Sequence, residues 1–166
     1  MKIVSRLIML AALIAAGVWL WTILSPSPEK IVRKRLALVA AEASFSSGEN
    51  VLLLAARSEN LASRFGTNVE ININAPEYGR PLEFVGRDEI TQAAAGMHMH
   101  LSDLKVEFPD VSVTVAPDKQ SAVADVAVRL QATGEKDFNV QEVKFTFQKI
   151  GGDWLITRVE SVRAPT

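Results

Sequence analysis

The longest apolar run of the chain lies at its start. No charged residue occurs from Leu7 to Leu24, a run of 18 residues, and Lys2 and Arg6 precede it. At about 1.5 Å per residue, this run with Ile3 in front nearly spans a hydrocarbon core. The tryptophans near its end are typical of a membrane interface. The pattern predicts a transmembrane helix over residues 3–24, within an anchor and linker over residues 1–27.

A removed signal peptide is the alternative interpretation of this start. Small residues in an A-x-A-like pattern should then mark a cleavage site. The best local candidate, residues 25–27, is followed by Pro28, which makes it a poor substrate. We therefore predict an uncleaved anchor.

The topology of the anchor depends on the basic residues that flank it. Lys2, Arg6 and the amino terminus favour a cytoplasmic N-terminus. The opposite orientation is favoured by a second basic group, Lys30, Arg33, Lys34 and Arg35. With the short tail kept inside, we predict a single-pass protein of the inner (cytoplasmic) membrane. Its folded domain, residues 28–166, would face the periplasm or the exterior.

Helical periodicity dominates the first half of this domain. Ser27 is a candidate N-cap, and a stripe of apolar positions predicts a helix from Pro28 to about Phe45. A second helix is predicted from about Glu49 to Phe65, with Gly66 as its C-cap. A third begins near Arg87, where the apolar positions are Ile90, Ala93, Ala94 and Met97.

Alternating patterns indicate strands elsewhere. One short strand is expected over residues 68–73, followed by a loop over residues 74–86. After residue 103 the alternation predicts strands over 104–108, 111–115, 121–132, 140–149 and 154–162. Pro109 and Asp110 interrupt the first of these, which suggests a bulge or an edge position. The order predicts an α+β fold, with three helices packed on a strongly curved antiparallel sheet and one transmembrane helix before them.

Composition narrows the function classes. The formal net charge is −1, so the chain lacks the basic surplus of a nucleic-acid-binding protein. It has no cysteine, which excludes disulfides, thiolate metal sites and a cysteine nucleophile. Apolar residues make up 48%, as expected for a packed domain.

Residues 29–162 resemble the nuclear transport factor 2-like superfamily, which includes ketosteroid isomerase-like and SnoaL-like domains. The resemblance rests on "NLASRFGTNVEIN", "FVGRDEITQAAA" and "VKFTFQKIGGDWLITRVESV". It implies a cystatin-like cone with an apolar pocket between the helices and the sheet. It does not choose a function, because such domains catalyse, bind ligands or only associate.

Both histidines of the chain lie in one short segment, as His98 and His100. On a strand the two rings would share a face, with Cα atoms about 7 Å apart. A metal site needs three or four ligands, and Asp103 is the only carboxylate near them. A second interpretation is acid–base catalysis by one of them. The third is a helix-to-strand junction with one ring half buried and the other in solvent, and we favour it.

Other candidate site residues carry less information. Asp125 could be a lone carboxyl in the pocket or belong to the outer face of its strand, and we favour the outer face. A ligand pocket would involve Tyr78, Met97 and His98. The ketosteroid isomerase mechanism requires a tyrosine on the first helix of the domain. That helix has none, because Tyr78 is the only tyrosine. We predict no metal site and no cofactor.

These observations favour a membrane-anchored, non-catalytic binding or assembly module. The alternative is a small-molecule lyase or isomerase that uses His98 or His100 as a base. For the protein as a whole, the expected partners are the membrane, a small hydrophobic ligand or an envelope protein, and a second copy through the open sheet face. Phe145 and Phe147 are candidates for that face or for the core.

Overall fold

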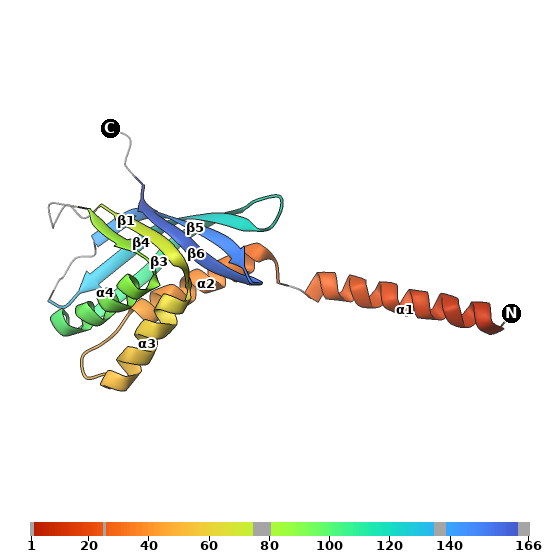
Figure 1. Ribbon diagram of the computed structural model, residues 1–166, viewed down its shortest axis with the longest axis horizontal. Helices are drawn as coiled ribbons and strands as arrows, with labels where there is room; N and C mark the ends of the chain where they lie inside the picture. The colour runs from red at the N-terminus through yellow and green to blue at the C-terminus, as the bar shows by residue number, and fades with distance from the viewer. Residues whose placement is uncertain (1, 25, 75–80, 135–138, 163–166) are drawn as a thin grey trace.

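The computed structural model describes residues 2–24, 26–74, 81–134 and 139–162. Three helices lie against one side of a curved sheet, and a fourth extends away from the domain (Figure 1). In chain order the elements are α1 (Lys2–Leu24), α2 (Pro28–Ala43), α3 (Val51–Ser63), β1 (Phe65–Ile73), β2 (Leu82–Val85), α4 (Arg87–His100), β3 (Leu104–Val115), β4 (Ser121–Ala132), β5 (Asn139–Ile150) and β6 (Asp153–Ser161). The predicted α+β class is confirmed.

Side-chain caps fix the starts of α2 and α3. The Ser27 hydroxyl accepts a hydrogen bond from the Lys30 main chain at 3.4 Å, as the sequence predicted. The Asn50 side chain accepts one from Leu52 N at 2.8 Å, so α3 begins at Val51. The predicted end of α3 was wrong, because the chain already enters β1 at Phe65.

The six strands form one sheet in the order β2-β1-β6-β5-β4-β3. All neighbours are antiparallel except β1 and β6, which are parallel. The prediction of a wholly antiparallel sheet was therefore wrong at this one junction. Side-chain alternation reports which face a residue occupies, but not the direction of the neighbouring strand.

The short strand β2 was predicted as loop. It pairs with the end of β1, from Leu82 opposite Ile73 to Val85 opposite Glu70. Four residues are too few for alternation to separate a strand from an extended loop. The predicted interruption at Pro109 and Asp110 is confirmed as a bulge, since the register between β3 and β4 shifts between Glu107 and Asp110.

The core lies between the concave side of the sheet and the helices. The stripe of α2 predicted from the sequence is buried there, through Val32, Leu36 and Val39. Phe145 and Phe147 are also buried, so they belong to the core and not to an exposed sheet face. Together with Ile156 of β6, these side chains occupy the hollow that the cone encloses.

The helix α1 projects from the domain (Figure 1). Its apolar side chains from Met9 to Leu20 are exposed, with Val18 and Trp19 at 63% and 67%. Within the described part of the chain, no helix combines the length and the apolarity that crossing a membrane requires.

Candidate functional site

The two histidines lie in the last turn of α4. The ring of His98 is half buried and meets the Phe45 ring edge-on, with 4.4 Å between ring centroids. His100 is exposed. Because residues two apart on a helix do not share a face, the rings are not arranged for chelation as they would be on a strand. This is the helix-to-strand junction that the sequence favoured, and no group of three or more metal-ligating side chains occurs among the described residues.

The other predicted site residues are not brought together. Met97 is on α4 with 43% of its surface exposed. Asp125 is exposed on the outer face of β4, where its main-chain partner on β5 is Lys144. Tyr78 lies outside the described residues. The structure therefore does not assemble Met97, His98 and Asp125 around one cavity.

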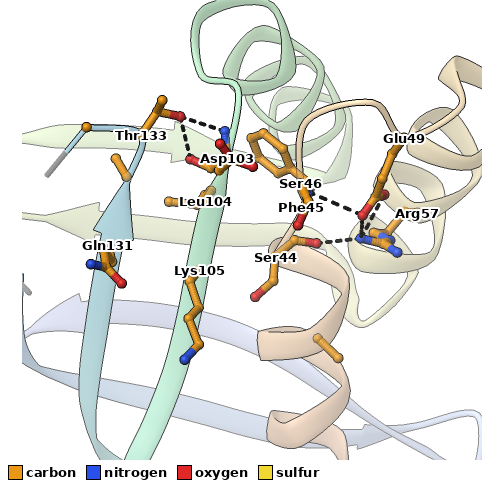
Figure 2. A pocket seen from close by; sticks show the side chains of 13 residues that line it. Ser44, Phe45, Ser46, Glu49, Arg57, Asp103, Leu104, Lys105, Gln131 and Thr133 are labelled. Atoms are coloured by element: carbon orange, nitrogen blue, oxygen red, sulfur yellow. Dashed lines mark hydrogen bonds and ion pairs between the residues drawn. The ribbon is translucent and has the colours of Figure 1, made fainter.

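An open cleft of about 490 Å³ lies instead at the rim of the cone (Figure 2). We call it the rim cleft. It is bordered by the loop after α2, the start of β3 and the end of β4. Its lining comprises Ala41, Ser44, Phe45, Ser46, Glu49, Arg57, Asp103, Leu104, Lys105, Gln131, Ala132, Thr133 and Gly134.

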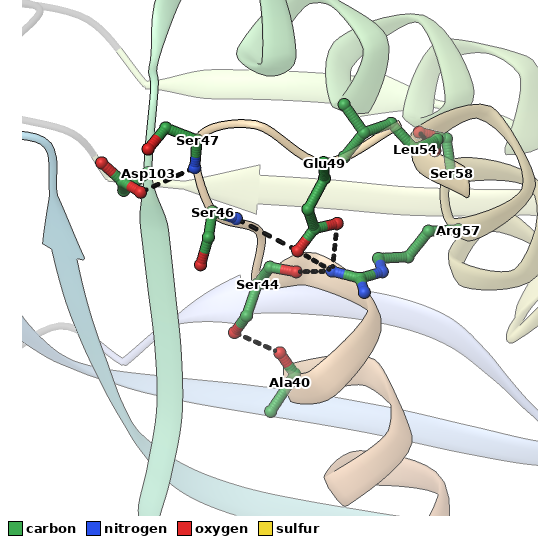
Figure 3. Close-up of polar contacts among 9 residues, drawn as sticks. All are labelled: Ala40, Ser44, Ser46, Ser47, Glu49, Leu54, Arg57, Ser58 and Asp103. Atoms are coloured by element: carbon green, nitrogen blue, oxygen red, sulfur yellow. Dashed lines mark hydrogen bonds and ion pairs between the residues drawn. The ribbon is translucent and has the colours of Figure 1, made fainter. Parts of the chain in front are cut away.

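One wall of the rim cleft is the loop of residues 44–50, held by Arg57 of α3 (Figure 3). The Arg57 guanidinium donates to the Ser44 carbonyl at 2.6 Å and to the Glu49 carboxylate at 3.2 Å. The same carboxylate accepts a hydrogen bond from Ser46 N at 3.2 Å. Its second oxygen is buried and accepts no hydrogen bond among the described residues, although Arg57 Nη1 lies 3.1 Å from it. The charges of this pair are thus used to fold the loop.

Asp103 joins this loop to the sheet. Its carboxylate accepts a hydrogen bond from Ser47 N at 2.8 Å. Its main-chain N–H donates to the Thr133 hydroxyl at 2.6 Å, and that hydroxyl donates to the Asp103 carbonyl at 3.0 Å. These bonds tie the loop to the start of β3 and to the chain after β4.

His98 lies behind this wall, because it touches Phe45 and does not line the rim cleft. Burial lowers the pKa of its imidazole, the nearby Arg57 charge lowers it further, and Glu49 opposes them. The neutral imidazole is therefore favoured near pH 7. The neutral His98 ring packs on Phe45 and so contributes to the packing of the fold at this position.

Sequence reasoning missed Glu49 and Arg57 as members of the site. The available signal was the break "SSGEN" before a capped helix, since a carboxylate next to an N-cap can bind the main chain of its own loop. Glu49 can pair with Arg57 because the first two turns of α3 bring residue 57 back beside the loop that precedes the helix. The sequence named Asp103 only as a potential metal ligand.

Solved structures with similar folds come from several bacteria. An NTF2-like protein with a cystatin-like fold from Novosphingobium aromaticivorans matches with a TM-score of 0.63 and 18% identity, over 89% of this chain and 86% of that one. An NTF2-like protein of unknown function from Pseudomonas putida matches with a TM-score of 0.61 and 12% identity, over 84% and 90%. The chain has the nuclear transport factor 2-like, cystatin-like fold.

A candidate scytalone dehydratase from N. aromaticivorans also shares this fold, with a TM-score of 0.58 and 15% identity over 81% of this chain and 84% of that one. No protein-family model matches the sequence, and no curated protein matches it either. At these identities the nuclear transport factor 2-like neighbours establish the fold alone.

Proposed function

We propose that this protein is a membrane-anchored, non-catalytic module that binds a protein partner outside the cytoplasm through the rim cleft. The observation that carries the proposal is the use of the cleft's charges. Arg57 and Glu49 bind each other and main-chain groups of the loop, and Asp103 binds Ser47 N, so the three residues build a fixed surface. A catalytic acid or base instead needs a side chain within hydrogen-bond reach of a substrate.

The hollow of the cone supports the same proposal. Leu36, Phe147 and Ile156 are almost completely buried there. Small apolar ligands favour enclosed, mostly apolar pockets. The rim cleft is open, and hydroxyl, amide and charged groups lie in it beside the apolar Phe45 and Leu104. A polar segment of another protein fits such a surface better than a small hydrophobic ligand does.

The anchor is supported by α1. Its apolar side chains from Met9 to Leu20 are exposed, and the helix extends away from the domain (Figure 1). Moving one exposed side chain such as valine, leucine or isoleucine from water into an apolar environment is favourable by roughly 1.5–3 kcal/mol. The basic residues Lys2 and Arg6 favour N-terminus-inside insertion, which would place the rim cleft outside the cytoplasm.

The lyase or isomerase alternative would require a histidine at the cavity. Neither His98 nor His100 lines the rim cleft or the groove of about 470 Å³ between α2 and β3. No observation favours it over the binding module.

A photocrosslinking amino acid at Ala41 tests the binding site. Ala41 is exposed, lines the rim cleft and has no part in the Arg57 and Asp103 contacts. We expect a discrete protein adduct in intact cells from position 41 and none from the exposed Ala55 of α3, which serves as the matched control. Equal adducts from both positions, or none from Ala41, would contradict the proposed site.

A C-terminal alkaline phosphatase fusion tests the topology. We expect an active fusion that stays in the membrane fraction and is released only by detergent. An inactive fusion would show that the orientation is the opposite of the proposed one. A chain released from the membrane without residues 1–27 would show that the start of the chain is a cleaved signal peptide.

A further inference from the structure

The cationic side chains of the domain differ in whether a carboxylate neutralises them. Away from the start of α2, ion pairs with glutamates occupy several of them, namely Arg57, Arg64, Lys105, Arg129 and Arg158. A second group consists of exposed lysines for which no ion pair occurs among the described residues: Lys30, Lys34, Lys119 and Lys149. We call these four lysines the anchor-side surface.

The four lysines come from three segments that meet at one end of the domain. Lys149 N donates to the Gln120 carbonyl at 2.8 Å, so the turn between β5 and β6 lies beside the turn between β3 and β4. Arg35 of α2 forms an ion pair with Asp153 at 3.8 Å, which places the first half of α2 at the same end. Both turns lie on the side of the domain from which α1 leaves (Figure 1).

The carboxylates at this end already have other partners. Glu29 pairs with Arg33 at 3.0 Å, and Asp153 pairs with an arginine as well. Asp118 accepts a hydrogen bond from a main-chain N–H of its own turn at 3.0 Å. The anchor-side surface therefore has four positive charges that no carboxylate pairs with, in a chain whose formal net charge is −1. A surface of this kind is complementary to a dense layer of negative charge.

The length of the linker keeps this surface close to the end of α1. Only residues 25–27 separate Leu24 from Pro28, so the two Cα atoms are at most about 14 Å apart. The headgroup layer of a bilayer extends roughly 5–8 Å beyond the hydrocarbon core. Charges at physiological salt attract one another over about 8 Å more. The first turn of α2 in an anchored chain is therefore within reach of headgroup charges.

We propose that the anchor-side surface binds the anionic headgroups of the membrane that holds α1, and so keeps the domain against the bilayer. Lysine binds phosphate as a point charge, without the fixed geometry that an arginine pair requires. Ile150 is 47% exposed beside Lys149, and a basic surface with a projecting apolar side chain is typical of contact with a membrane interface.

Binding of this kind would also orient the rim cleft. The anchor-side surface lies where β3 ends, whereas the rim cleft includes Leu104, at the start of β3. A domain bound by its anchor-side surface would therefore turn the rim cleft away from the bilayer. The inference rests on the anchor of the proposed function, but not on the orientation of that anchor, because headgroup charge alone provides the attraction.

Fluorescence of the full-length protein in lipid nanodiscs tests the proposal. The chain has no cysteine, so Gln120→Cys can hold a single environment-sensitive dye at the anchor-side surface. We expect its emission to rise about twofold when phosphatidylglycerol replaces a quarter of the phosphatidylcholine, because the attraction depends on anionic lipid. High salt should reverse the rise, since it shortens the distance over which the charges attract.

A dye at Met99→Cys is the positional control. Met99 is exposed in the last turn of α4, next to His98, which contacts Phe45. Phe45 pairs with Leu104 at the start of β3, so position 99 lies at the end of the domain that is far from the anchor-side surface. Its emission should be the same in neutral and in anionic discs.

Charge variants measure the contribution of the lysines. Lys34→Gln should weaken binding to anionic discs about fivefold, and replacing all four lysines by glutamine should abolish the rise at position 120. Lys144→Gln is the matched control, because Lys144 is also in no ion pair among the described residues but lies on β5, opposite Asp125. Circular dichroism should be the same for all variants.

The outcomes separate this inference from the anchor. Protein that enters the discs but shows no rise at position 120 would overturn the inference and leave the anchor intact. An equal rise in neutral discs, or an equal loss in Lys144→Gln, would overturn it too, because the contact would not depend on these charges. A chain that does not enter the discs at all would overturn the anchor and the inference together.

Discussion

The hollow of the sheet and the rim cleft are neighbours in one fold, but different side chains build them. The hollow is filled by aliphatic and aromatic groups such as Leu36 and Phe147. The rim cleft has a mixed lining of polar and apolar side chains, and Arg57, Glu49 and Asp103 hold its loop in place. In this chain the buried apolar core is therefore distinct from the polar contacts that hold the surface we propose as a partner site.

The largest expected effect comes from the hollow. Replacing Phe147 by alanine removes a fully buried ring, so we expect the free energy of unfolding to fall by about 3–5 kcal/mol in denaturant titrations. Thr146→Ala, its neighbour on the outer face, should change it by less than about 0.5 kcal/mol. Similar losses for the two variants would mean that the hollow is not the packed core.

A smaller loss is expected at the rim cleft. Arg57→Ala removes the donor to the Ser44 carbonyl and the charged partner of the Glu49 carboxylate, which keeps its hydrogen bond from Ser46 N. The Arg57 and Glu49 side chains are 26% and 21% exposed. We expect a loss of about 1–3 kcal/mol. If the loop is held by this contact, a double-mutant cycle with Glu49→Gln should show that the two losses are not additive. Additive losses would show that the two residues act independently.

The cap of α3 should contribute less again. Asn50→Ala removes the acceptor for Leu52 N, so we expect a loss of about 1 kcal/mol, and Asn50→Gly should cost only a few tenths. Asn60→Ala, an exposed position in the same helix, is the control. Thermal unfolding followed by circular dichroism can rank the three variants, and an Asn60 effect as large as that of Asn50 would argue against the cap.

The smallest effect is a pH dependence from His98. Its folded-state pKa is lowered, so the unfolded chain binds the proton more tightly. The contribution to stability is present above the ordinary histidine pKa of about 6.5 and is lost as the pH falls from there through the lower pKa of the folded state. We expect His98→Gln to flatten the decline in unfolding free energy between neutral and mildly acidic pH. His100→Gln should leave that decline as it is in the wild type, and an equal change in both variants would refute the assignment.

Much of the fold could be predicted from the sequence. The stripe of Val32, Leu36 and Val39 fixed the buried side of α2, and two-residue alternation located the long strands. The bulge at Pro109 was predicted as well, because proline cannot donate to the ladder. These signals are local, since each depends on the backbone geometry of a few adjacent residues.

Only the tertiary structure decided the parts that join distant segments. It placed β1 parallel to β6, put β2 at the edge and turned Phe145 and Phe147 into the core. It also brought Asp103 to Ser47 and Arg33 to the Val111 carbonyl of β3. The spacing of residues along a chain sets which face of an element is apolar, but which faces and edges meet depends on how all the elements pack together.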